Sequence, residues 1–78
     1  MTKLYRKATV TRTKAEHIKR FGHFAFSGLF VLGHNSDGQI VNYFSDKMQD
    51  EGYSPEHYAI ELVTVMIDPL TGETILAD

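Results

Sequence analysis

The chain has no cysteine, so its 78 residues must fold without disulfide bonds, around a hydrophobic core alone. A chain of this length buries only about 60–65% of its unfolded surface, which leaves room for one small core and one domain spanning residues 1–78. The missing thiols exclude iron–sulfur clusters, thiolate zinc sites and cysteine nucleophiles. We therefore expect a folded domain in a reducing compartment, the cytoplasm.

Charge is strongly segregated along the chain. Residues 1–20 carry a formal charge of +6 and residues 21–78 carry −8, which together give the net −2. No apolar stretch approaches the roughly 20 residues needed to cross a bilayer, and no apolar region follows the basic N-terminus as in a signal peptide. We expect no membrane association.

The first third of the chain predicts a strand followed by a short helix. Residues 3–13 are rich in β-branched and aromatic types, with apolar side chains at even positions. Arg6 and Arg12 share that parity, so we expect them near strand ends or at a sheet edge. Thr13 to Glu16 fits a capping box for a helix over residues 14–21, which Gly22 ends.

Residues 23–34 are apolar on both parities, which predicts a central strand covered on both sides. Gly28 indicates a bulge or a close backbone approach. The turn-forming residues 35–38 predict a hairpin that returns as a strand over residues 39–45. The large aromatic side chains of this region are assigned to the core: Phe24, Phe26, Phe30 and Phe44.

The remainder predicts a helical turn and two strands. The turn covers residues 46–51, and β-branched residues favour a strand over residues 59–68, with a helix over residues 55–66 as the open alternative. A glycine-containing loop over residues 68–72 leads into a short strand over residues 73–77. The fold class is therefore α+β, a small mixed or antiparallel sheet of four to five strands with one short helix.

One eight-residue helix is too short to cover a whole sheet face. A second copy of the chain is the simplest cover for the apolar side chains left over, and two-fold dimers are the commonest oligomers. The expected oligomer face consists of Ala25, Leu29 and Val31.

The basic segment is the feature of highest contrast, and it forms the expected basic pole: Tyr5, Arg6, Lys7, Arg12, Lys14, Lys19 and Arg20. Such a surface could contact the phosphates of a nucleic acid or a signalling nucleotide, with the tyrosine stacking on a base. The ordinary alternative is that these charges pair with the acidic remainder of the chain. The acidic side chains that could dock on a basic partner form the acidic pole: Asp46, Asp50, Glu51 and Glu56.

The four histidines match no metal-binding spacing, so we expect neither a metal site nor a cofactor. His17 and His23 flank the predicted helix beside cations, and a pair of imidazoles next to a phosphate-binding group could serve as acid and base in a small nuclease. Surface histidines without such a role are far more common. No catalytic residues are therefore assigned.

The absence of a catalytic signature and the two charge poles favour a non-enzymatic binding protein, an inhibitor or regulator that covers a site on a partner protein. Small stand-alone chains of this kind are frequent among virus-encoded inhibitors, in which case the compartment would be the host cytoplasm. A binder of a phosphate-rich ligand is the first alternative, and a histidine-dependent nuclease is the second.

Overall fold

The computed structural model describes residues 4–77 and confirms a small α+β fold. Its elements follow the order β1 (Leu4–Arg12), α1 (Ala15–Phe21), β2 (Phe24–Val31), α2 (Asp37–Asp50), the 3₁₀ turn η1 (Pro55–His57), β3 (Tyr58–Ile67) and β4 (Thr74–Leu76). The strands form one antiparallel sheet in the order β2-β1-β3-β4. None of the helices in this part of the chain has both the length and the apolar character needed to cross a membrane.

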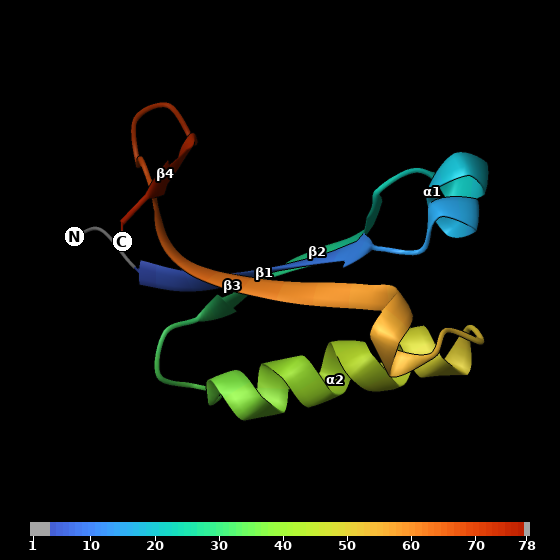
Figure 1. Cartoon of the computed structure of the whole chain (residues 1–78). Helices are drawn as coiled ribbons and strands as arrows, with labels where there is room; N and C mark the ends of the chain where they lie inside the picture. The colour runs from blue at the N-terminus through green and yellow to red at the C-terminus, as the bar shows by residue number, and fades with distance from the viewer. Residues whose placement is uncertain (1–3, 78) are drawn as a thin grey trace.

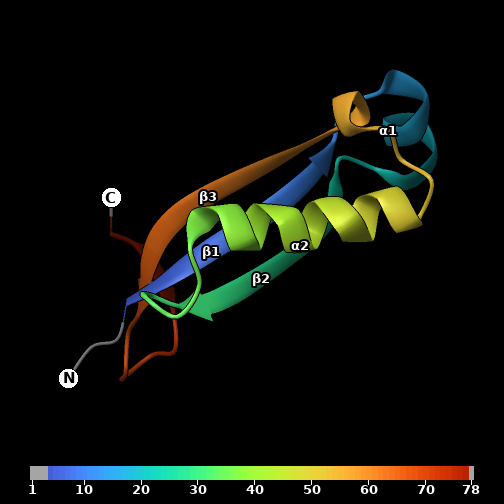
Figure 2. The same cartoon turned by 90° about the horizontal axis from the view of Figure 1, so that it is seen from below.

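Helix α2 connects β2 to β3, the two strands that flank β1, and lies along one face of the sheet (Figures 1 and 2). Both flanking strands run antiparallel to β1 and therefore parallel to each other, so β2, α2 and β3 form a β-α-β unit split by β1. The β3–β4 hairpin curves away on the opposite side, and α1 lies at the other end of the sheet (Figure 1).

The core lies between α2 and the sheet. Ile40, Phe44 and Met48 are buried at four-residue spacing along α2. They face Ala8 and Val10, which are fully buried on β1, an inner strand of the sheet. The apolar parity expected for residues 3–13 thus points at the helix, and among residues 4–77 no helix lies on the opposite face of the sheet (Figure 1).

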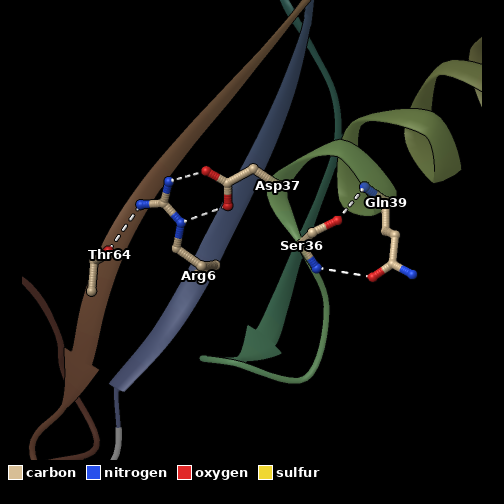
Figure 3. A network of polar contacts seen from close by, with 5 residues as sticks. All are labelled: Arg6, Ser36, Asp37, Gln39 and Thr64. Carbon is tan, nitrogen blue, oxygen red and sulfur yellow. Dashed lines mark hydrogen bonds and ion pairs between the residues drawn. The ribbon is translucent and has the colours of Figure 1, made fainter.

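The strand expected over residues 39–45 is wrong, because these residues and the turn expected over residues 46–51 form the single helix α2. Ser36 is its N-cap: the Ser36 hydroxyl accepts a hydrogen bond from the Gln39 amide, and the Gln39 side chain accepts one from the Ser36 amide (Figure 3). This capping box starts a helix where a hairpin turn was expected.

The central position expected for residues 23–34 is also wrong, since β2 is shorter and lies at an edge of the sheet. A register shift opposite Val10 and Thr11 leaves Ala25 as the extra residue of a bulge. Gly28 itself pairs regularly with Ala8, and what comes close to it is a side chain, because an added Cβ would lie 3.1 Å from Cζ of Phe44.

The other expected elements are confirmed with small changes at their ends. β3 is a strand throughout, and the helical alternative for residues 55–66 survives only as the turn η1. Gly22 ends α1 with a positive φ of 90°. The capping box expected from Thr13 is absent: Lys14 is the N-cap, and the Thr13 hydroxyl donates instead to the carbonyl of Glu56.

Candidate functional site

Arg12, the last residue of β1, ties three segments together at one end of the molecule. Its Nε donates to the hydroxyl of Tyr53 (2.8 Å), and its Nη1 donates to the carbonyls of Phe21, Gly22 and Phe24 (3.3, 3.2 and 2.6 Å). Its guanidinium also lies 5.3 Å from the ring centroid of Phe21 and 5.8 Å from that of Tyr53. The turn after α1 is therefore fixed by several charge-assisted hydrogen bonds.

Helix α1 is held at this end with none of its residues buried. Phe21, its last residue, is 55% exposed, and Phe24 at the start of β2 is 57% exposed. The core position expected for Phe24 is therefore wrong, since beyond the bulge Phe24 pairs with Thr11 and lies on the face of the sheet away from α2. Arg20 also places its guanidinium 5.3 Å from the ring centroid of Phe21, so two arginines lie close to this ring.

A cleft of about 450 Å³ opens between α1 and the segment that follows α2. We call it the α1 cleft, and its lining residues are Arg12, Glu16, His17, Arg20, Phe21, Glu51, Gly52 and Tyr53. Two arginines and two glutamates face the same space, together with three aromatic rings, those of His17, Phe21 and Tyr53. The lining therefore offers apolar contact bounded by both signs of charge.

His17 is a half-buried residue in the lining of the α1 cleft. Its ring packs edge-on against Tyr53 (4.9 Å between centroids) and against His57 (5.7 Å), and its Nδ1 is buried without a hydrogen-bond partner. Glu56 Oε1 lies 3.9 Å from His57 Nε2. His23, expected to work with His17, is exposed beyond the end of α1. Within residues 4–77, no three histidine, aspartate or glutamate side chains gather in a way that could hold a metal ion.

The basic pole is divided among three places. Arg6 lies on the α2 side of the sheet, where its Nε and Nη2 donate to the two carboxylate oxygens of Asp37 (3.1 and 2.7 Å) and Nη1 donates to Thr64 (2.9 Å; Figure 3). Tyr5 and Lys7 belong to the opposite parity of β1, which faces away from α2. The others lie at the α1 end: Arg12, Lys14, Lys19 and Arg20.

The contact between Arg6 and Asp37 changes the acidity of Asp37. The hydrogen bond from Arg6 lowers the pKa of Asp37 below its ordinary value of 3.8, and the positive charge of Arg6 acts in the same direction. Arg6 and Arg12, which share the apolar parity of β1, therefore both find acceptors within the fold. Strand ends or a sheet edge were expected for them, but β1 is an inner strand and Arg6 is not at its end.

The acidic pole is divided as well. Asp46 and Asp50 lie on the exposed side of α2, where they line a shallow hollow of about 220 Å³ with Tyr43 and Lys47. Glu51 lines the α1 cleft. Glu56 is exposed beside His57, so the four carboxylates do not form one surface.

The three residues of the expected oligomer face separate at the bulge. Ala25 packs against the core under α2. Leu29 is 45% exposed, and Val31 lies opposite Tyr5 on the side of the sheet away from α2. Only Leu29 and Val31 therefore share a face.

Sequence reasoning did not assign Phe21 to a site. The available signal was a phenylalanine in the last turn of a basic helix, directly before the glycine that ends it, but the ring could equally have faced a core. Tyr53 gains its role from Arg12, 41 residues earlier in the chain.

Comparisons with protein-family models, curated proteins and solved structures find no match to this chain.

Proposed function

We propose that this protein is a non-enzymatic binding protein, an inhibitor or regulator that covers a site on another protein, and that it docks through the α1 cleft with Phe21 as its anchor. The observation that carries the proposal is the exposed Phe21 ring, which lies close to two arginines at a turn that Arg12 fixes. Aromatic and arginine side chains held in a defined geometry are the commonest energetic centres of protein interfaces.

The exposure of two phenylalanine side chains outside the small core supports this proposal. Few side chains of this small chain are buried, yet Phe21 and Phe24 are more than half exposed at the same end of the molecule. Burying a phenylalanine side chain contributes about 1.5–3 kcal/mol, so the free protein forgoes a stabilisation that a partner would restore. Because the turn is already ordered, little conformational entropy is lost on docking.

The charges of the cleft favour a protein over a phosphate-rich ligand. Arg6 is paired with Asp37, and Arg12 is occupied by main-chain carbonyls and Tyr53. Glu16 and Glu51 would repel a polyanion that entered the cleft. A protein surface with an apolar projection and charges of both signs is the better complement.

Three proteins test the proposal: the wild type, Phe21→Ala and Leu70→Ala. Leu70 lies in the β3–β4 loop, far from α1, and is 93% exposed, so it is a matched control for the loss of an exposed apolar side chain (Figure 1). The immobilised wild type should capture a protein from extracts of the cells in which it acts. Mass spectrometry identifies that protein, and the affinities of the purified pairs are then measured.

We expect Phe21→Ala to weaken binding by about 30-fold or more, the effect of losing an interfacial anchor, and Leu70→Ala to leave it unchanged. Circular dichroism should show that both variants remain folded. Equal affinities for the wild type and Phe21→Ala would refute the proposal. So would binding to nucleic acid alone, recognised by an affinity that falls steeply with salt.

A further inference from the structure

The edge strand β2 presents free main-chain groups that fit a second copy of the same strand. Leu32 donates its amide to the carbonyl of Leu4, and hydrogen-bonded pairs alternate along an antiparallel ladder. The pairs of β1 with Phe26, Gly28 and Phe30 are therefore the hydrogen-bonded ones. The amides and carbonyls of Ser27, Leu29 and Val31 consequently point outward, beyond the edge of the sheet.

Beyond the bulge at Ala25, this edge lacks the usual protection against pairing among the described residues. β2 has eight residues and contains neither a charged residue nor proline, whereas the opposite edge strand, β4, has only three residues. Figure 2 shows β2 along one border of the sheet, with no other strand beside it on that side. Edge strands of monomeric proteins are normally short, charged or covered, so a long uncharged edge indicates a pairing surface.

We propose that two copies of the chain pair through β2, antiparallel and about a two-fold axis at Gly28, so that the two sheets become one. In this register Ser27 lies opposite Leu29 of the second copy, and the reverse, as hydrogen-bonded pairs made from the outward groups. Phe26 lies opposite Phe30 of the second copy on the helix side, in the closer, non-hydrogen-bonded pairs where aromatic side chains contribute most.

Glycine at the axis suits this arrangement. Gly28 meets its own symmetry mate in a close pair, and it has no side chain on the face where Phe44 already approaches. Neighbouring strands lie about 4.8 Å apart, so helices lying over β1 and its copy would be about 14 Å apart. That distance exceeds the 8–10 Å of directly packed helices and leaves room for the exposed Tyr43 side chains between them.

A proline scan tests the proposal without breaking the monomer. The amide of Leu29 points outward, so Leu29→Pro removes no hydrogen bond within the chain, but it removes two across the axis. Leu76→Pro, on the opposite edge strand, is the matched control. The amide of Asp68 donates to the carbonyl of Glu73, and the amide of Ala77 donates to the carbonyl of Thr64. Because hydrogen-bonded pairs alternate along β3 and β4, the amide of Leu76 points outward.

Sedimentation equilibrium should give the wild type twice the chain mass at high micromolar concentration. We expect Leu29→Pro to raise the dimer dissociation constant at least about tenfold, and Leu76→Pro to leave it unchanged. A wild type that remains monomeric overturns the proposal, and so does a dimer that Leu29→Pro does not weaken.

Cross-linking tests the register itself and does not depend on how a proline is tolerated. The chain has no cysteine, and opposite residues of a hydrogen-bonded pair have Cα atoms about 5.5 Å apart, within disulfide range. Ser27→Cys mixed with Leu29→Cys should give the mixed disulfide on mild oxidation, whereas Ser27→Cys mixed with Leu70→Cys should not. Equal yields in the two mixtures overturn the register. The surface lies apart from the α1 cleft, so loss of the dimer and loss of partner binding are separate results.

Discussion

Arg6 and Arg12 occupy the same parity of β1 but are satisfied by different acceptors. Arg6 faces a carboxylate and a hydroxyl, whereas Arg12 faces a phenol and main-chain carbonyls. Both arginines fall on the even-numbered positions of β1, whose other side chains are apolar, so the sequence alone identifies them as charged exceptions on an apolar face. Their acceptors lie up to 58 residues away in the chain, so only the fold could show what satisfies them.

Arg12 should be among the most sensitive polar positions of the chain. Lysine keeps the charge but cannot span Tyr53 and the carbonyls after α1, so we expect Arg12→Lys to lower the free energy of unfolding by about 1–3 kcal/mol. Urea denaturation measures the change. Arg20→Lys is the control, since Arg20 is exposed, and it should stay within about 0.5 kcal/mol of the wild type. Equal effects of the two substitutions would contradict the role given to Arg12.

The Arg6–Asp37 contact predicts a pH dependence with a defined sign. Because Arg6 lowers the pKa of Asp37 in the folded protein, the carboxylate stabilises the fold above its unfolded pKa, and this stabilisation is lost as the pH falls through the lowered value. The stability difference between the wild type and Asp37→Asn should therefore be full at neutral pH and shrink below pH 3.8. Urea denaturation across this range measures it. In an Arg6→Gln background the same substitution should show much less pH dependence.

At the scale of elements, residues 39–45 show what local patterns could and could not decide. Apolar pairs at 40–41 and 43–44 read as a strand when the segment is taken alone. The same sequence also carries helix signals, namely the Ser36–Gln39 capping box and the four-residue spacing of Ile40, Phe44 and Met48. β1 was predictable from its alternation of apolar and polar side chains, and β3 from its many β-branched residues.

The α1 cleft could not be predicted in the same way. Its lining comes from residues 12–21 and 51–53, which approach only when the sheet forms and α2 crosses it. Local sequence specified α1 and the glycine that ends it. The meeting of α1 with Tyr53 depends on long-range contacts, namely the edge-on packing of His17 against the Tyr53 ring and the hydrogen bond of Arg12 to the Tyr53 hydroxyl.

The capping box gives a prediction at this scale. Ser36→Ala should destabilise the protein by about 1 kcal/mol, because the amide of Gln39 loses its acceptor at the start of α2. Ser54→Ala is the matched control, since Ser54 precedes η1 without a side-chain capping bond and should change stability far less. Thermal unfolding of the two variants distinguishes them, and an unchanged Ser36→Ala would count against the cap.

At the scale of the whole molecule, the core is one-sided. Phe44 is 4% exposed between α2 and the sheet, whereas Phe24 lies outside this layer. We expect Phe44→Ala to cost about 3–5 kcal/mol and Phe24→Ala less than about 1 kcal/mol. Urea denaturation of both variants provides the comparison, and similar losses would mean that a second layer covers Phe24 in solution.

The charge segregation along the chain does not become two opposed surfaces. The fold pairs Arg6 with Asp37 and brings Arg12, Arg20 and Glu51 to one cleft, so opposite charges separated in sequence become neighbours. The prediction of two poles therefore described the chain better than the molecule. Distance along the sequence could not reveal this, because α2 returns acidic residues to the basic strand.

The chain is elongated, 43 Å along its longest axis, with α1 at one end and the start of β1 and the β3–β4 hairpin at the other (Figure 1). A fluorophore, affinity tag or biosensor tether attached at the start of β1 or in the β3–β4 hairpin would therefore stand well away from the α1 cleft. Immobilised molecules would present that cleft to the solution in a uniform orientation, which makes surface-based affinity measurements a sound choice for this protein.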